Sequence, residues 1–253
     1  MTTLIRKLVS PHNWRGFAGV ARSALDPVDV FRRYYLHRGS YPYTVRLRTP
    51  IGKLALELRS HDDFTTIHEV FFRQDYRLSN AEAKRLRVAV DFGANIGITA
   101  AYFLTRNPQV QVYSYEPVPS NIALARKNLA PFASRLEFIE CAVGTEEGVV
   151  DFGVENSGRY GGIGVPHSSQ IKVPCRRGEA ELARMLQRHP RIDAVKLDIE
   201  GMEIPIIKSL TPSTLGEIGC ILAECDGREI SLPNFVHHQY LSIARFTATM
   251  SPG

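Results

Sequence analysis

Four acidic residues each follow a short apolar segment of the sequence, at the point where a strand would end. They are Asp91, Glu116, Asp198 and Glu224. In an open parallel sheet, ligands bind beyond the carboxyl ends of the strands, so acids from separate strands gather on one edge. We therefore expect a negatively charged rim at this edge, suited to a ligand that carries positive charge.

A loop with two glycines follows the first of these acids. Residues 91–97 read Asp-Phe-Gly-Ala-Asn-Ile-Gly and stand between an expected strand and an expected helix. Gly93 and Gly97 permit a tight turn and a close approach of the backbone to a ligand. The helix beyond them offers free N–H groups to a carboxylate. Asp91 would attract an amino group or a sulfonium and repel a pyrophosphate, and the dinucleotide pattern GxGxxG is missing from the sequence.

Glu116 stands 25 residues after Asp91, at the end of the next expected strand. An acid at this place can accept hydrogen bonds from both hydroxyls of a ribose. Because enzymes that bind NAD use the same device, Glu116 indicates an adenosine ribose rather than one particular cofactor.

Strands and helices are expected to alternate from residue 88 onward. Short apolar runs predict strands at 88–90, 111–115, 136–141, 194–197 and 218–223. Helices are expected at 98–105, at 120–129 with Ser120 as its cap, and at 179–188, where the pattern is amphipathic. Residues 149–173 alternate and are rich in glycine, which suggests a β-ribbon or loop. The alternation of strands and helices predicts an α/β fold with a mostly parallel sheet and helices on both of its faces.

The N-terminal part of the chain has a different pattern. Asp26 before Pro27 predicts the start of a helix. Residues 44–48 and 53–58 alternate in a way that is typical of a β-hairpin, and residues 62–72 predict a short helix. We therefore expect an N-terminal helical segment with a β-hairpin over residues 1–80 and a second domain over residues 81–253.

The motifs together resemble those of a known family. Residues 91–97, the pair Glu116-Pro117, residues 141–144 (Cys-Ala-Val-Gly) and residues 195–203 (Val-Lys-Leu-Asp-Ile-Glu-Gly-Met-Glu) are similar to the FkbM family of methyltransferases, which use S-adenosylmethionine. The resemblance covers roughly residues 44–225. It implies a Rossmann-like class I methyltransferase fold with a seven-strand sheet. It also implies that the enzyme O-methylates a hydroxyl of a sugar, a polyketide or a related metabolite.

The resemblance also implies a cofactor site. The residues implied to bind S-adenosylmethionine are Asp91, Gly93, Ala94, Asn95, Gly97, Glu116, Pro117, Cys141, Ala142 and Asp198. Within this set, the residues of the glycine loop line the methionine end and Glu116 holds the ribose. Cys141 and Ala142 border the adenine, and Asp198 lies near the transferred methyl group and the acceptor.

Asp198 is the first candidate for the base that removes the proton of the acceptor hydroxyl, with Glu200 and Glu224 behind it. An alternative is that Asp198 binds the ammonium of the cofactor. Lys196 shares the strand face of Asp198, so it either tunes that carboxylate or packs along its stem. Glu200 and Glu203 would share a helix face if the helix started at Asp198, where they either orient an acceptor or are solvated.

No metal site is expected. His237 and His238 are adjacent, so their side chains diverge on a strand or helix. A divalent ion held by Asp198, Glu224 and a histidine lacks a ligand motif. The four cysteines form no CxxC pair, which argues against zinc and against a disulfide framework.

The sequence departs from the family pattern in three places. Cys175-Arg176-Arg177 stands where a Leu-Asp pair is common, and Ser209 replaces a frequent glycine. Only 29 residues follow Glu224, where two further strands are expected, and residues 246–250 are a candidate for one of them. These departures concern the acceptor pocket and the sheet edge more than the cofactor site.

Composition and charge narrow the class of protein. The hydrophobic fraction of 44% allows a sizeable core, and the sequence has no run of 18 apolar residues that would predict a membrane span. Because the cysteines do not support a disulfide framework, a reducing cytoplasm is the expected location. Residues 1–50 hold nine Lys or Arg against two Asp. This basic segment is either a solvated helical face or a surface for an anionic membrane, a nucleic acid or an acidic partner, and no basic–aromatic repeat suggests an RNA-binding module. The acceptor is expected to be a small molecule or glycan, nucleic acid is not expected, and the oligomeric state is left open.

Two other functions compete with the methyltransferase. A nicotinamide-dependent oxidoreductase could use a similar sheet, although the missing third glycine and the charge of Asp91 argue against it. A non-catalytic binding protein could keep the fold without the chemistry, which the short C-terminus and the changed segment after Val173 suggest.

Overall fold

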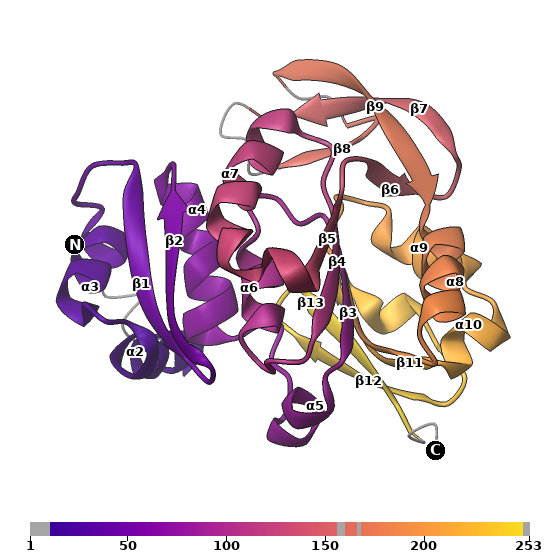
Figure 1. Cartoon of the computed structure of the whole chain (residues 1–253), viewed down its shortest axis with the longest axis horizontal. Helices are drawn as coiled ribbons and strands as arrows, with labels where there is room; N and C mark the ends of the chain where they lie inside the picture. The colour runs from indigo at the N-terminus through magenta and orange to yellow at the C-terminus, as the bar shows by residue number, and fades with distance from the viewer. Residues whose placement is uncertain (1–10, 156–159, 166–167, 250–253) are drawn as a thin grey trace. The chain divides into compact units, whose positions relative to one another are not determined.

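The computed structural model describes residues 11–155, 160–165 and 168–249 (Figure 1). By its internal packing the chain forms two compact units, one ending at Arg77 and one beginning at Leu78. We describe each unit by itself. The domain boundary expected after residue 80 stays a prediction, and Arg6 and Lys7 of the basic segment lie outside the described residues.

The first unit combines helices with a two-stranded antiparallel sheet. Its elements are α2 (Pro11–Ser23), α3 (Pro27–Leu36), β1 (Tyr43–Thr49), β2 (Gly52–Leu58), α4 (His61–Ile67) and the π-helix η1 (His68–Arg73). The Asp26 side chain caps α3 by accepting a hydrogen bond from the Asp29 N–H, as the sequence predicted. The hairpin is also confirmed, with Tyr43 opposite Leu58 and Thr49 opposite Gly52.

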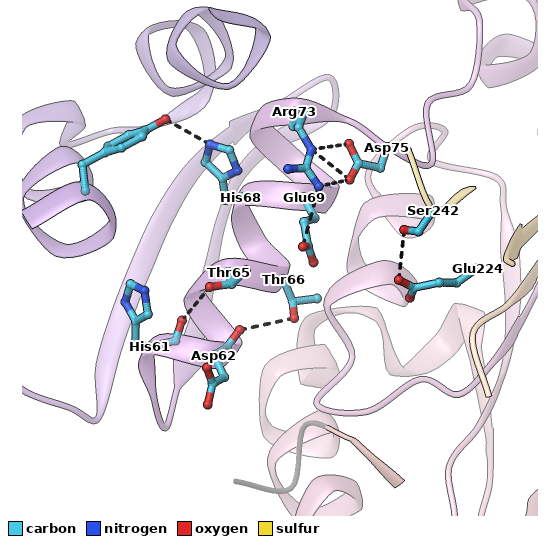
Figure 2. A network of polar contacts seen from close by, with 11 residues as sticks. His61, Asp62, Thr65, Thr66, His68, Glu69, Arg73, Asp75, Glu224 and Ser242 are labelled. Carbon is cyan, nitrogen blue, oxygen red and sulfur yellow. Dashed lines mark hydrogen bonds and ion pairs between the residues drawn. The ribbon is translucent and has the colours of Figure 1, made fainter. Parts of the chain in front are cut away.

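The expected helix over residues 62–72 is present but changes type at His68. Ser60 caps its α-helical part, and the π-helical part follows. Arg73 and Asp75 form an ion pair just beyond it (Figure 2). Helix α2 lies close against this segment, because a Cβ atom at Gly19 would stand 2.0 Å from the carbonyl oxygen of Phe72. Such a crossing needs glycine and gives no signal in hydrophobic periodicity.

The second unit is built on a seven-strand sheet in the order β12-β13-β11-β10-β3-β4-β5. The strands are β3 (Val88–Phe92), β4 (Gln111–Tyr115), β5 (Leu136–Ile139), β10 (Ile192–Leu197), β11 (Ile218–Glu224), β12 (Phe235–Tyr240) and β13 (Ile243–Ala248). Five neighbouring strands run parallel, and the two C-terminal strands are antiparallel to their neighbours. The expected seven-strand, mostly parallel sheet is confirmed, including both strands after Glu224.

Helices cover both faces of this sheet, as expected (Figure 1). They are α5 (Asn80–Arg85), α6 (Ile98–Leu104), α7 (Pro119–Leu129), η2 (Ala130–Arg135), α8 (Gly178–Arg188), α9 (Glu203–Ser209), α10 (Pro212–Gly216) and η3 (Gly227–Glu229). Helices α6 and α7 lie on one side of the sheet, and α8, α9 and α10 lie on the other. The main core lies on the second side, where Leu182, Met185 and Ile206 pack against residues such as Val90 and Phe92.

A smaller sheet fills the segment between β5 and α8. Its strands are β6 (Ala142–Gly144), β7 (Gly148–Val154), β8 (Gly161–Ile163) and β9 (Ser169–Arg177), in the order β6-β9-β7-β8. The ribbon expected over residues 149–173 is therefore present. Its buried side encloses a small cluster that includes Phe152, Val173 and Cys175.

Two local predictions are wrong. Ser120 does not cap α7, because the helix begins at Pro119 and its N-cap residue, Val118, makes no side-chain capping bond. The strand expected to reach Cys141 ends at Ile139, and the chain then enters the smaller sheet at Ala142.

Among the described residues, no helix is both long and apolar enough to cross a membrane.

Candidate active site

The four acids identified from the sequence lie at the carboxyl ends of four neighbouring parallel strands. In sheet order these strands are β11, β10, β3 and β4 (Figure 1). Glu224 is the last residue of β11, and Asp198 and Glu116 follow β10 and β4 directly. Asp91 is the second-last residue of β3. The strand order thus brings the acids to one edge of the sheet.

The glycine loop is bound to the end of β4. The N–H groups of Gly93 and Ala94 both donate to the carbonyl oxygen of Tyr115, over 3.1 and 2.9 Å. The Asn95 N–H donates to Oε2 of Glu116 over 2.9 Å. These loop N–H groups therefore have partners within the protein. The free N–H groups expected from the sequence belong to the start of the helix beyond the loop, so these three bonds do not test that expectation.

The two glycines of the loop have different tasks. Gly93 has a φ of +82°, and a Cβ atom there would stand 2.0 Å from the carbonyl oxygen of Asp198. It allows the loop after β3 to lie directly against the loop after β10. Gly97 has a φ of +87°, and its Cβ atom would stand 2.7 Å from Cδ1 of Leu129. Gly97 therefore serves the packing of α6 against α7, which the sequence alone did not separate from ligand contact.

Glu116 is buried and already accepts several hydrogen bonds. Oε1 accepts from the Val118 N–H over 3.0 Å and from Nδ2 of Asn121 over 3.2 Å, while Oε2 accepts from Asn95. Burial raises the pKa of Glu116 above its ordinary value, although these donors act in the opposite direction. A carboxylate offers about four acceptor positions, so one remains for a ligand hydroxyl. Asn121 was not singled out in the sequence, although its place in the first turn of α7 is a usable signal.

A fully buried lysine joins the glycine loop to the strand that precedes Asp198. Nζ of Lys196 donates to the carbonyl oxygen of Gly93 over 2.6 Å. It lies 3.1 Å from Oδ1 of Asp91 and 3.4 Å from Oδ2 of Asp198, and the Lys196 side chain is 1% exposed. Burial would lower the pKa of Lys196, but the two carboxylates outweigh it and raise the pKa. Of the two roles left open by the sequence, the contacts favour tuning of the carboxylates.

Asp91, Lys196 and Ser114 stand side by side on one face of the sheet, in register across β10, β3 and β4. Burial raises the pKa of Asp91, and the charge of Lys196 opposes this effect. Neither carboxylate oxygen of Asp91 nor Oγ of Ser114 makes a well-aligned hydrogen bond within the described part of the chain. The short distance from Lys196 to Asp91 is thus an ionic contact. Ser114 was missed in the sequence, although it alternates correctly to share the face of Asp91.

The three candidate bases differ in their surroundings. The Asp198 side chain is 32% exposed, and its backbone N–H donates to the Phe92 carbonyl oxygen over 3.3 Å. Glu224 is exposed and accepts a hydrogen bond from Oγ of Ser242 over 3.0 Å (Figure 2). Glu200 is exposed and has a φ of +49° in the turn after β10. Of these three acids, Asp198 is the one with a carboxylate oxygen 3.4 Å from Nζ of the buried Lys196.

The expectation that Glu200 and Glu203 share a helix face is wrong, because α9 begins only at Glu203. Glu203 is buried, and its carboxylate accepts hydrogen bonds from the N–H groups of Ile199 and Gly201 over 2.8 and 2.9 Å. It therefore fixes the turn that carries Glu200 instead of facing an acceptor.

The remaining cofactor candidates lie past β4 and β5. Pro117 is partly exposed, and Cys141 and Ala142 are buried. Burial raises the pKa of the Cys141 thiol to about 12, so it is not a nucleophile at neutral pH. These positions are compatible with a lining role but leave the adenine contact a prediction.

His237 and His238 point to different sides of β12, as expected for neighbours on a strand. The His237 ring stacks on Phe246 with centroids 4.9 Å apart. No group of three or more metal-ligating side chains is found among the described residues. A pocket lined by Leu86, Arg191 and Asp193 lies at the opposite edge of the sheet, where β3 and β10 begin, so it is separate from the acidic rim.

The family model described as the Methyltransferase FkbM domain matches residues 91–222, just over half of the chain. The 2-O-methyltransferase NoeI of Sinorhizobium fredii is 35% identical over 69 residues, which are 27% of this chain and 28% of that protein. The 31-O-demethyl-FK506 methyltransferase FkbM of Streptomyces tacrolimicus is 29% identical over 103 residues, covering 41% of this chain and 40% of that protein. The aligned region therefore spans well under two thirds of either relative.

The chain is also similar to solved structures of methyltransferases. A methyltransferase from Geobacter sulfurreducens is 12% identical, with 69% of this chain and 77% of that chain covered and a TM-score of 0.41. The putative methyltransferase yhhF from Escherichia coli is 12% identical, with 78% and 93% covered and a TM-score of 0.40. Both scores are low, so the fold assignment rests on the strand order and the family match.

Proposed function

Because the chain belongs to the FkbM methyltransferase family, we propose that it transfers a methyl group from S-adenosylmethionine to a hydroxyl oxygen of a small molecule or glycan. The names of NoeI and FkbM describe methyl transfer to oxygen, which supports oxygen as the acceptor atom. Since the aligned region covers 28% and 40% of those proteins, the acceptor itself is not carried over from them.

The chemistry of the acidic rim fits a positively charged cofactor. Asp91 and Asp198 carry two negative charges, and Lys196 compensates one of them. Asp91 is fully buried, and burial raises its pKa, an effect that Lys196 opposes. A buried carboxylate is costly, and a further cationic group nearby lowers that cost. The sulfonium and ammonium groups of S-adenosylmethionine are cations of this kind, and we assign its methionine end to this part of the site.

The ribose of the cofactor is assigned to Glu116. Its carboxylate is held in place by the backbone of Asn95 and Val118 and by the side chain of Asn121. Because these donors already fix the Glu116 carboxylate, less conformational entropy of this side chain is lost when a ligand binds. Residues Pro117, Cys141 and Ala142 continue the same side of the site toward the adenine.

S-adenosylmethionine, when bound, supplies an electrophilic methyl group on its sulfonium. The protein must then hold the acceptor hydroxyl in line and take up its proton. We assign the base to Asp198, because it directly follows the central strand β10, next to the cofactor loop, and is partly exposed. Lys196, two residues before Asp198, contacts its carboxylate, and Glu203 fixes the turn that follows Asp198. Glu224, on the next strand, is the second candidate.

The observation that carries this proposal is the alignment of four acids on four neighbouring parallel strands, inside or directly beside the segment matched by the family model. A nicotinamide-dependent oxidoreductase and a non-catalytic binding protein are not favoured by any contact in the site. Both remain outcomes of the test.

The test is transfer of a labelled methyl group from S-adenosylmethionine to a panel of sugars and polyketides with free hydroxyls. We expect a labelled product and release of S-adenosylhomocysteine. Asp198→Asn should lower the rate by about 10²–10⁴-fold, the usual contribution of a general base, with cofactor affinity changed much less. Asp226→Asn, at an exposed acid paired with Arg228, is the control and should leave the rate unchanged. Cofactor binding without transfer to any acceptor would favour the non-catalytic alternative.

A further inference from the structure

Helix α2 presents an apolar face to solvent in the first unit. Gly16, Gly19 and Val20 are buried on one side of the helix. Trp14, Ala18 and Ala21 are exposed and recur at the spacing that places them together on the opposite side. The Trp14 side chain is the most prominent of them, with an exposed fraction of 66%. A large exposed apolar side chain on a helix face marks a contact surface when others adjoin it.

Trp14 is continuous with an aromatic cluster that anchors it. Its ring meets Phe17 edge-on at 6.4 Å, and Phe17 stacks on Tyr35 at 4.6 Å. Phe31 joins the cluster at 4.9 Å from Tyr35. The exposed indole is therefore supported by partly buried rings that belong to both α2 and α3.

Helix α3 adds a second exposed stripe. Val28 is 78% exposed and Leu36 is 42% exposed, with Arg32 between them at helical spacing. Arg32 forms an ion pair with Asp29, so the charge on this stripe is partly balanced. Helices α2 and α3 therefore each expose apolar side chains next to arginine.

Basic side chains border the apolar face of α2. Arg15 and Arg22 are exposed and lie about two turns apart on the same flank of the Trp14 face. α2 carries no acidic residue, so its exposed surface is apolar and positive. Helices with this distribution, tryptophan on the apolar face and arginine beside it, bind in the headgroup region of anionic bilayers.

We propose that the exposed face of α2 binds an anionic lipid surface, with Trp14 entering the headgroup region and Arg15 and Arg22 contacting lipid phosphates or carboxylates. Charge complementarity favours lipid as the occupant, and the amphipathic ring of tryptophan suits this interface. The inference rests on the first unit alone and does not depend on the proposed enzymatic activity.

The chain offers a direct probe, because Trp14 is its only tryptophan. Intrinsic fluorescence of the full chain would be followed while vesicles of phosphatidylcholine with phosphatidylserine are added, and vesicles of pure phosphatidylcholine serve as the reference. We expect emission to move to shorter wavelengths, and quenching by acrylamide to fall, with the anionic vesicles only. Sedimentation with the same vesicles should give the affinity.

Two double variants distinguish the effect of the arginines on α2 from the effect of the net positive charge of the chain. Arg15→Gln with Arg22→Gln should weaken binding by about thirty-fold, from the usual contribution of each basic residue near an anionic surface. Arg126→Gln with Lys172→Gln removes the same charge from exposed positions of the second unit and should change binding little. Trp14→Ala should weaken sedimentation while leaving the circular dichroism spectrum unchanged.

Several results would overturn the proposal. Emission that does not respond to anionic vesicles would do so, as would equal losses from the two double variants. Emission already at short wavelength and shielded from acrylamide without lipid would show that the chain itself covers Trp14. Emission that shifts with protein concentration in the absence of vesicles would show that a second copy covers it. Methyl transfer can succeed or fail independently of each of these results.

Discussion

Replacing Lys196 by methionine removes the ammonium that lies between two acids while keeping the apolar stem of the side chain. In the structure Nζ stands 3.1 Å from Oδ1 of Asp91 and 2.6 Å from the carbonyl oxygen of Gly93, and the side chain is 1% exposed. Removing one partner of a buried ion pair costs about 3–5 kcal/mol, because the other charge stays buried without compensation. Asp198 is partly exposed, so we base this magnitude on Asp91 alone. We expect Lys196→Met to lose about 3–5 kcal/mol of unfolding free energy.

The assay is unfolding by urea at pH 7, with the midpoint and slope compared between variants. Lys172→Met, at an exposed lysine paired with Asp151, is the matched control and should change stability by less than about 0.5 kcal/mol. The double variant Asp91→Asn with Lys196→Met should regain a large part of the loss, since no unpaired carboxylate then remains buried. A loss below about 1 kcal/mol for Lys196→Met, the range of exposed ion pairs, would refute the role given to this lysine.

Three further predictions follow from the site. Glu116→Ala should weaken S-adenosylmethionine binding by roughly 10–100-fold in calorimetry, because a charged hydrogen bond is lost. Glu140→Ala, at an exposed ion pair, is the control and should leave the affinity unchanged. Equal affinities of the two variants would exclude the ribose assignment. Gly93→Ala should lower the unfolding free energy by at least about 1 kcal/mol more than Gly201→Ala. Both glycines have a positive φ, but only the new Cβ atom at Gly93 would also clash with backbone, at the carbonyl oxygen of Asp198. Equal losses would contradict this packing. Burial raises the pKa of the Cys141 thiol to about 12, so little thiolate forms at pH 8. Iodoacetamide should therefore label Cys141 far more slowly in the folded chain than in the unfolded chain, as followed by mass spectrometry. Comparable labelling rates would argue against its burial.

Much of the sheet could be predicted from the sequence because its signals are local. The run at residues 111–115 is bounded as expected, and Asp26 with Pro27 starts α3 through a bond to the next turn. The glycine loop of residues 91–97 likewise joins a strand to a helix. In each case the residues that decide the structure are near neighbours in the chain.

Other features depend on contacts between distant residues and were missed. Helix α7 begins at Pro119, one residue before Ser120, and the carboxylate of Glu116 accepts a hydrogen bond from the N–H of its N-cap residue, Val118. The turn after β10 is fixed by Glu203, which delays α9 to that residue. Strand β12 carries polar residues on the sheet edge, including His238, so its apolar signal is weak.

The candidate site was predictable in its residue types but not in its internal bonding. The sequence placed acids at four strand ends, and the strand order makes those strands neighbours. It did not show that Gly97 serves helix packing or that the N–H groups of the loop are bound to Tyr115 and Glu116. These facts need the register of β3 against β4, which periodicity does not supply.

The central claim is that the acidic edge of the larger sheet binds S-adenosylmethionine. Isothermal calorimetry of the purified chain with S-adenosylmethionine, S-adenosylhomocysteine and NADH measures this directly. The account predicts saturable binding of one S-adenosyl compound per chain and no binding of NADH. Absence of any heat of binding with both S-adenosyl compounds, from a chain shown to be folded, would contradict it.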